Sequence, residues 1–294
     1  EKLIWNSVEK EIVNLSGASV PSEQETIKAK NFLKEFRLNL PVPSFFSKEK
    51  LPTRIKPRDF SLFKKWTKDY FAGQDYMRVS PINLLFSKLR RIYRTWYSRF
   101  IFDNEELSEI GDYVFFPLHF QPEMTTLVCA PHCLNQVSVI EDLAKSLPAG
   151  VRLVVKEHHG SIGRRSLKDY KQIKQNWNVL LLGPEVNTME FIKEAKVVTT
   201  INSTVGLQGL LLGKPVITLA RVGYDACSQI IRGHLTPKEE YSKLILEAID
   251  AKINEEEIVK FCVAVERGLI DAEEGFNLEH PGYDKKSTTP ANIR

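Results

Sequence analysis

The pattern of hydrophobic and polar positions changes near Gly111. From there on, short apolar runs rich in β-branched residues alternate with stretches in which apolar residues recur at helical spacing. The strand-like runs are residues 113–116, 127–129, 152–155, 179–182, 197–200 and 216–219. The helical stretches between them are residues 136–146, 168–175, 188–194 and 205–212. Nearly continuous apolar strands that alternate with helices predict an α/β fold, with a parallel sheet covered on both faces.

The first 110 residues show no such alternation. Helical spacing predicts helices within residues 1–40, most clearly at 26–36, then at 60–71 and from Ser80 to about 102. A Pro-rich passage that begins at Leu40 is typical of an irregular linker.

The pattern divides the chain into three parts. We expect a mainly helical N-terminal region at residues 1–110 and an α/β domain at 111–284, whose residues 236–270 are again helical. The polar tail at 285–294 is expected to fray.

Positive charge is concentrated in one stretch. The 294-residue chain has a net charge of +4, but residues 48–99 hold fourteen Lys/Arg against four Asp/Glu, a local excess of +10. Its densest part, residues 88–100, mixes Arg with aromatic residues. We favour an amphipathic helix that packs its apolar side inward, with Arg outward; these apolar residues are Leu89, Ile92, Tyr93 and Trp96. Contact with an anionic membrane is the alternative. No nucleic-acid partner is expected, because no recognised nucleic-acid-binding module accompanies the charge.

Other features narrow the class of protein. The sequence has no apolar run of 18 residues and no secretory signal pattern, so we expect no membrane-spanning helix. Its four cysteines show no CxxC pair and no second ligand pair at zinc-site spacing, which favours unpaired buried thiols in a cytoplasmic protein over a metal site. The chain begins at Glu1 rather than Met, so we expect a trimmed, processed or fragmentary chain.

Candidate binding residues follow the predicted strands, where ligands of open parallel sheets bind. Strand 152–155 leads into Lys156, Glu157, His158 and His159, and then into Gly163 and Arg164. Charged groups at a strand end are costly to bury without partners, so this segment can present cationic groups to a phosphate ester. An exposed polar turn is the alternative.

The segment after strand 197–200 is the sharpest local signal. Asn202, Ser203 or Thr204 can cap the next helix, whose N-terminus would suit a phosphate. Gly206 permits close approach of the backbone. An ordinary capped helix is the alternative here.

Two other strand ends carry candidates. Pro184, after strand 179–182, can line a base or ribose pocket, although a plain turn fits equally well. After strand 113–116 come His119 and Glu123, and either can act as an acid or a base at a cleft. Hydrogen bonding of these two residues to the neighbouring backbone is the alternative.

Together these segments resemble the bacterial capsule polysaccharide biosynthesis family, which includes the Kdo transferases of capsule assembly. The resemblance covers about residues 111–225 and rests on segments in the family's order and spacing, namely 113–123, 147–148, 154–158, 163–164, 198–206 and 213–216. It implies a GT-B-type glycosyltransferase, in which a Rossmann-like C-terminal half binds the donor. It also implies a cytoplasmic enzyme near the inner membrane and, for the Kdo-transferring members, a CMP-sugar donor with no tightly bound cofactor.

The resemblance also suggests residue roles. By likeness to the more distant bacterial sialyltransferases, His158 and Ser203 or Thr204 would contact the donor phosphate, with Lys156 as a supporting charge. The chain departs from the family pattern at His159, where the family's KEHP motif has Pro, and at Gln208, where an acid would hold a ribose hydroxyl. No βαβ series is visible in residues 1–110, so the acceptor-side half is absent or reduced to a helical remnant.

We therefore expect a glycosyltransferase of surface polysaccharide biosynthesis that moves a sugar, Kdo from CMP-Kdo in the specific case, to a glycan or glycolipid. The expected catalytic residues are His119, Glu123 and His158. The expected nucleotide-sugar-binding residues are Lys156, Glu157, His158, Gly163, Arg164, Pro184, Asn202, Ser203, Thr204, Gly206 and Gln208. The alternatives are a nucleotide-sugar epimerase on the same scaffold, and a non-catalytic donor-half remnant that docks to a membrane through residues 80–102.

Overall fold

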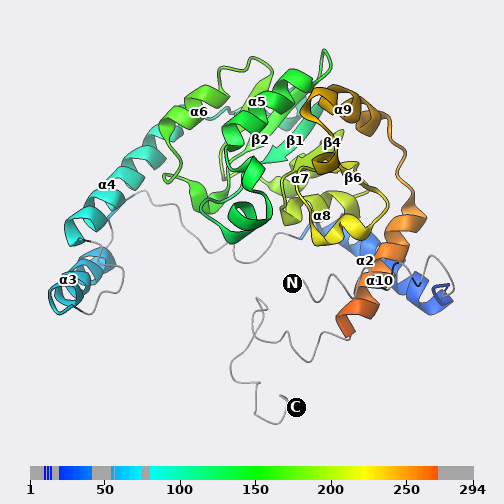
Figure 1. The fold of residues 1–294 in the computed structure, drawn as a ribbon, viewed down its shortest axis with the longest axis horizontal. Helices are drawn as coiled ribbons and strands as arrows, with labels where there is room; N and C mark the ends of the chain where they lie inside the picture. Colours follow the sequence, from blue (N-terminus) through cyan, green and yellow to red (C-terminus); the bar gives the residue numbers. More distant parts are fainter. Residues whose placement is uncertain are drawn as a thin grey trace, which may run out of the picture.

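A sheet of six parallel strands forms the centre of the molecule (Figure 1). The computed structural model describes residues 10, 12, 14, 20–41, 54–55, 57–73 and 80–270. The strands are β1 (Tyr113–Pro117), β2 (Arg152–Lys156), β3 (Val179–Leu182), β4 (Val197–Thr200), β5 (Val216–Thr218) and β6 (Ile230–Arg232). Their order is β3-β2-β1-β4-β5-β6, with every pairing parallel. This is the order of a Rossmann fold, which confirms the predicted fold class.

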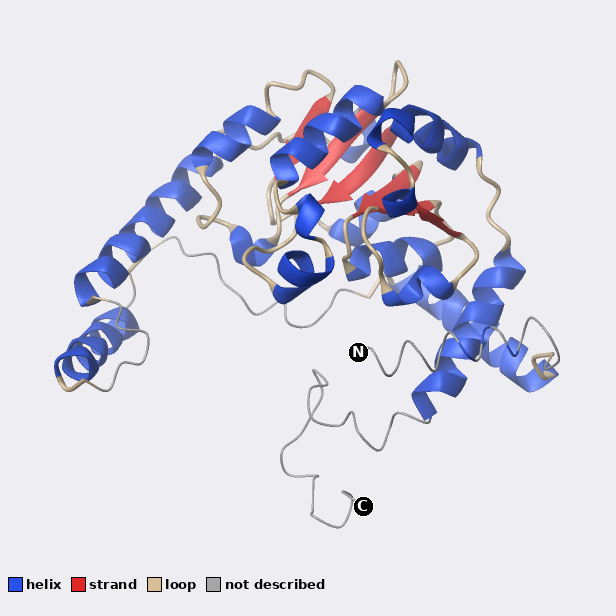
Figure 2. Cartoon of the chain, viewed as in Figure 1, coloured by secondary structure: helices blue, strands red, loops and turns tan. Residues whose placement is uncertain are grey.

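Helices cover both faces of the sheet (Figure 2). One face carries α5 (Gln136–Ser146), α6 (Leu167–Ile173) and α9 (Tyr241–Asp250). The other carries α2 (Glu23–Asn39), α7 (Thr188–Glu194), α8 (Thr204–Leu211) and α10 (Glu255–Ile270).

Residues along β1 alternate between the two layers. Val114 and Phe116 pack with the first set of helices, and Tyr113 and Phe115 pack with the second. All four side chains are buried, and each contributes about 1.5–3 kcal/mol to the free energy of unfolding. Burial on both faces is why the strands are continuously apolar in sequence.

Helix α2 packs onto this sheet, although it lies within the first 110 residues. A capping box between Ser22 and Glu25 begins the helix, and Leu33 is buried in the same core as α10. The Arg37 Nε donates to the Leu211 carbonyl at the end of α8 (2.7 Å), and Arg267 of α10 forms an ion pair with Glu25. The boundary predicted at residues 110/111 therefore does not separate α2 from the sheet.

Helices α3 (Pro57–Phe71) and α4 (Pro81–Ser98) extend away from the sheet (Figure 1). The side of α4 that meets the rest of the protein carries Thr95 and Ser98, which are fully buried. Leu89, Tyr93 and Trp96 are instead exposed, at 43%, 55% and 58%. The favoured interpretation of an inward-packed apolar side is therefore wrong for these three residues.

Two short segments also differ from the prediction. Residues 127–129 belong to a π-helical turn, η2 (Thr125–Cys129), rather than to a strand. Leu127 and Val128 are exposed there, whereas an inner strand of this sheet would bury both faces. Strand β6 was not predicted, because it has only three residues and ends in Arg232.

Some predictions fall largely or wholly outside the described residues: the helix before residue 20, most of the Pro-rich linker, and the tail at 285–294. Within the ranges that are described, no helix is both long and apolar enough to span a membrane.

Candidate functional site

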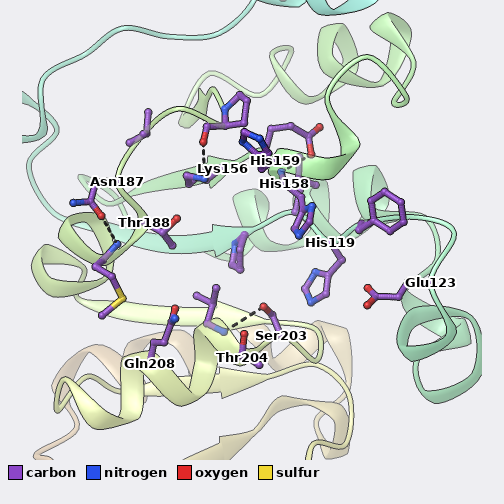
Figure 3. A pocket seen from close by; sticks show the side chains of 18 of the residues that line it. His119, Glu123, Lys156, His158, His159, Asn187, Thr188, Ser203, Thr204 and Gln208 are labelled. Carbon is purple, nitrogen blue, oxygen red and sulfur yellow. Dashed lines mark hydrogen bonds between the residues drawn. The ribbon is translucent and has the colours of Figure 1, made fainter. Parts of the chain in front are cut away.

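A cavity of about 870 Å³ lies at the carboxyl ends of β1, β2, β3 and β4 (Figure 3). The strand order reverses between β1 and β4, and ligands of such sheets bind at this point. The volume falls in the usual range for a small-molecule site. The lining residues that follow each strand in turn are 117–120, Glu123 and Thr125; 156–159; 184–189; and 202–205 with Gln208.

Lys156 places a buried ammonium group in the cavity wall. Its side chain is 8% exposed, and its Nζ donates to the Pro184 carbonyl at 3.3 Å. It forms no ion pair with any other residue that the structure describes. Burial lowers the pKa of Lys156 to about 8, while Glu157 and Glu185 act to raise it. The group is thus mainly cationic at neutral pH and would be stabilised by an anionic ligand.

The N-terminus of α8 forms the opposite wall, as Figure 3 shows. Ser203 is the N-cap, and its Oγ accepts from the Val205 N–H (3.2 Å). Thr204 and Gln208 lie along the same side of the cavity. A capped helix start offers a positive dipole end, which favours a phosphate group.

Gly206 does not line the cavity; it seats α8 against the neighbouring loop. A Cβ at this position would lie 2.3 Å from the Tyr224 hydroxyl oxygen, and that hydroxyl donates to the Ser203 carbonyl (2.6 Å). The sequence predicted that the backbone at Gly206 is approached closely. In the structure the group that approaches it is the Tyr224 side chain.

His119 is buried at the cavity wall and holds the β4–α8 turn. Its Nε2 accepts the backbone N–H of Asn202 at 3.2 Å, and the Asn202 Nδ2 donates to the Thr125 carbonyl at 2.8 Å. Burial, with smaller contributions from His158 and Arg165, lowers the pKa of His119 to about 3, and hydrogen bonding to the Pro117 backbone carbonyl opposes the shift. The imidazole is thus neutral at physiological pH, and its Nε2 is occupied by the backbone.

Glu157 is fully buried, and protein groups occupy both of its carboxylate oxygens. Oε1 accepts the His158 N–H (2.6 Å). Oε2 accepts from the Arg165 Nε (2.8 Å) and from the Tyr170 hydroxyl (2.6 Å). The Arg165 Nη2 also reaches the His119 carbonyl (3.1 Å). Protein donors therefore occupy the carboxylate of Glu157, although the residue lines the cavity and the sequence suggested a ligand contact.

His158 is positioned by this network. Its Nδ1 accepts the Gly160 N–H at 3.1 Å, and its ring packs against Phe120, with 5.8 Å between the ring centroids. Burial lowers the pKa of His158, whereas the Glu157 carboxylate raises it. The result is a fixed imidazole in the cavity wall, two residues after Lys156 in the sequence.

Gly163 and Arg164 do not line the cavity. Gly163 has a φ of 74° and faces α4, where a Cβ would lie 2.4 Å from the Arg91 carbonyl oxygen. The Arg164 guanidinium lies over the Phe120 ring at 5.4 Å, and its carbonyl accepts from the Arg94 Nη1. Both residues therefore attach α4 to the sheet domain, and their predicted ligand contacts have no support in this geometry.

Glu123 lies at the rim of the cavity, and Figure 3 shows its carboxylate pointing inward. Its backbone is fixed, because its carbonyl accepts from the Leu127 N–H (2.9 Å) and the Thr126 Oγ1 (3.1 Å). No group of three His, Cys, Asp or Glu side chains that could hold a metal occurs in the described part of the chain.

Sequence reasoning missed Arg165 and Tyr170. Arg165 follows directly after the two residues chosen, and Tyr170 looked like an ordinary apolar position of a helix. The signal for Arg165 was its place in the cationic Gly-Arg-Arg run at 163–165, and no sequence signal marked Tyr170.

The model of one protein family, described as capsule polysaccharide biosynthesis protein, matches residues 26–255. Protein FixF of Sinorhizobium fredii is 32% identical over 130 residues, which is 42% of this chain and 30% of FixF.

Two solved structures are similar at low identity. KpsC of Thermosulfurimonas dismutans, a beta Kdo 2,4 transferase, is 13% identical with a TM-score of 0.44, covering 89% of this chain and 62% of KpsC. Anabaena HepE in complex with UDP-glucose is 15% identical with a TM-score of 0.34, covering 57% of this chain and 49% of HepE. The chain thus spans less than two thirds of the length of each of these relatives.

Proposed function

Because this chain belongs to the capsule polysaccharide biosynthesis family, we propose that it provides the donor-binding part of a glycosyltransferase that builds a bacterial surface polysaccharide. The donor is a nucleotide sugar bound in the cavity at the ends of β1 to β4. One observation supports the proposal most directly. The buried ammonium of Lys156, which has no carboxylate partner among the described residues, lies across the cavity from the capped N-terminus of α8. Two positive features around one cavity favour a phosphate ester.

The proposed ligand lies between the two walls. Lys156 and His158 contact the phosphate from one side, and Ser203 and Thr204 contact it from the other. Pro184 and Gln208, which also line the cavity, contact the base and ribose. Gln208 supplies a neutral amide to the ribose, so it can hydrogen-bond a hydroxyl without adding a negative charge near the phosphate.

Catalysis by such a site consists of positioning and charge stabilisation. The bond between the anomeric carbon and the phosphate oxygen breaks, and the negative charge that develops on the phosphate is stabilised by Lys156, His158 and the α8 dipole. An acceptor hydroxyl forms the new bond and gives its proton to a base. We assign the base to Glu123, whose carboxylate points into the cavity.

His119 takes a positioning role in this proposal. Its Nε2 is occupied by the Asn202 N–H, and its pKa of about 3 keeps it neutral. It therefore fixes the β4–α8 turn, from which Ser203 faces the donor phosphate.

The finer identity of the substrates follows the family resemblance. The favoured donor is CMP-Kdo, and the acceptor is a glycan or glycolipid. In the GT-B arrangement that we propose, a second half closes over the cavity and presents the acceptor.

The test is calorimetric titration of the chain with CMP, UDP, GDP and ADP. We expect selective binding of CMP, and weaker CMP binding by His158→Ala. Lys145→Met, which changes an exposed lysine outside the cavity, is the matched control and should bind as the wild type does. Selective binding of UDP would overturn the CMP-type donor. An epimer formed from a UDP-sugar without an acceptor would overturn the transferase.

A further inference from the structure

Helix α4 has an exposed apolar stripe along its whole length. At roughly 100° per residue, its exposed apolar positions fall within a band about 100° wide. They are Ile82, Leu85, Phe86, Leu89, Tyr93 and Trp96, and Phe100 continues the band just beyond the helix. Phe86 and Phe100 are 64% and 72% exposed. No described segment of the chain covers this band.

The opposite side of α4 is attached to the protein. The Arg91 Nε donates to the Ile162 carbonyl, Thr95 lies against Gly163, and both Thr95 and Ser98 are buried. The orientation of α4 is thus set by contacts on its polar side, and the apolar stripe faces outward because of them.

Positive charges flank the stripe. Residues 80–102 contain five Lys or Arg and no Asp or Glu. By the same rotation per residue, Arg90 lies beside one border of the stripe and Arg99 beside the other, and Arg94 and Lys88 follow them toward the attached side of the helix. Asp59 of α3 neutralises Lys88 (3.2 Å). Arg90 and Arg99 are exposed and form no ion pair within the described residues.

We propose that α4 docks this protein in the interface of an anionic lipid surface. Aromatic side chains bordered by cations are the composition of a helix that lies in a membrane plane: the apolar side enters the headgroup–acyl boundary, and the cations meet lipid phosphates. A protein partner for the stripe would itself need an acidic border. This inference does not depend on the donor site.

Co-sedimentation of the full chain with lipid vesicles tests the proposal. The vesicles contain phosphatidylcholine alone or phosphatidylcholine mixed with phosphatidylglycerol. We expect binding to the anionic vesicles only, weakened by high salt because salt screens exposed charges. Arg90→Gln with Arg99→Gln should weaken binding by about fivefold for each charge removed. Trp96→Ser with Phe100→Ser should weaken it by about tenfold or more.

Matched controls separate the stripe from general surface effects. Trp177→Ser removes a tryptophan that is 89% exposed outside α4, and Lys145→Gln with Lys252→Gln removes two exposed charges elsewhere. Both controls should bind vesicles as the wild type does. Since all the changed side chains are exposed, circular dichroism and nucleotide binding should be unchanged in every variant.

Two outcomes would overturn the proposal. One is equal or absent binding to the two kinds of vesicle. The other is a wild-type dimer, seen by light scattering, that the Trp96/Phe100 variant converts to monomer while vesicle binding does not change. That result would assign the stripe to a second copy of the chain.

Discussion

Burial and ligand binding act in opposite directions on Lys156. Its pKa is about 8 in the folded protein, against an ordinary value of 10.5. Between these two values the unfolded chain binds the proton more tightly, so the contribution of this group to stability rises with pH across that window. Below about pH 8 the folded protein holds a buried charge at a penalty. A bound phosphate reverses this preference, because it stabilises the ammonium form.

Lys156→Met should therefore separate stability from binding. It keeps the aliphatic stem and removes the buried charge, so we expect a melting temperature at pH 7 that is equal to or above that of the wild type. Nucleotide affinity should fall by about ten- to a hundredfold, because a charged hydrogen bond is lost. Wild-type affinity should also fall as pH rises above about 8, and the variant should lack this dependence. A variant that melts earlier yet binds nucleotide normally would contradict the assigned role.

Glu157 differs from Lys156, because its buried carboxylate contacts the Arg165 guanidinium and the Tyr170 hydroxyl. Glu157→Gln leaves the Arg165 guanidinium buried without a counter-charge, so we expect a loss of about 3–5 kcal/mol in the free energy of unfolding. Glu105→Gln is the control, because the Glu105 carboxylate pairs with Arg152 but is 37% exposed. This variant should lose about 1 kcal/mol or less in the free energy of unfolding. Urea denaturation measures both. Equal losses in the two variants would remove the special role of the buried pair.

For single residues, the sequence predicted where a residue lies better than what its side chain contacts. His158 and Ser203 both line the cavity, as predicted, because residues that follow parallel strands meet at one sheet edge. The direction of a side chain is set by its neighbours in space, so the sequence could not show that Glu157 turns toward Arg165 and Tyr170. For the same reason Arg164 was expected at the ligand, whereas it lies over Phe120.

At the scale of elements, the attachment of α4 depends on one glycine. Gly163 combines a φ of 74° with contact to the Arg91 carbonyl and to the Thr95 side chain, so a methyl group at this position would push α4 away. Gly150 has a φ of 84° but no atom within 4 Å of its Cβ position. Gly150→Ala should therefore lower the free energy of unfolding only by the backbone strain, about 1 kcal/mol.

Gly163→Ala should lower the free energy of unfolding by the same backbone strain and also weaken the contact between α4 and the sheet domain. We expect faster amide hydrogen exchange and faster proteolysis within residues 81–98 in this variant, while the same residues stay protected in Gly150→Ala. Similar protection of α4 in both variants would show that the contact at Gly163 does not hold the helix.

The elements themselves were largely predictable, because a strand buried on both faces must be apolar at every position. That reasoning failed for residues 127–129, whose β-branched and apolar side chains satisfy the local pattern although the sheet has no place for them. It also failed for the apolar side of α4. Periodicity identifies such a side but does not show what covers it, and the polar contacts of Arg91 and Thr95 decided the orientation.

At the scale of the whole molecule, helices that are far apart in sequence pack together on one face of the sheet. Helices α2 and α10 pack together on one face, with Ala29 and Leu33 in the same core as Val198 and Phe261. The Glu25–Arg267 and Arg37–Glu255 ion pairs lie at the two ends of this contact. Since the pairs are partly exposed, the apolar contacts carry most of the stability. We therefore expect α2, α10 and the sheet to unfold as one unit.

Leu33→Ala tests this expectation. Leu33 is 1% exposed, so its truncation should cost about 2–5 kcal/mol, whereas Phe32→Ala, at a position 49% exposed on the same helix, should cost far less. If α2 is part of the sheet's cooperative unit, Leu33→Ala will lower the protection of the β1 and β4 amides against hydrogen exchange by the same free energy as it lowers global stability. If only the amides of α2 and α10 lose protection, the two helices form a separate unit. A sheet domain that folds without α2 would then carry the cavity at the ends of β1 to β4 alone.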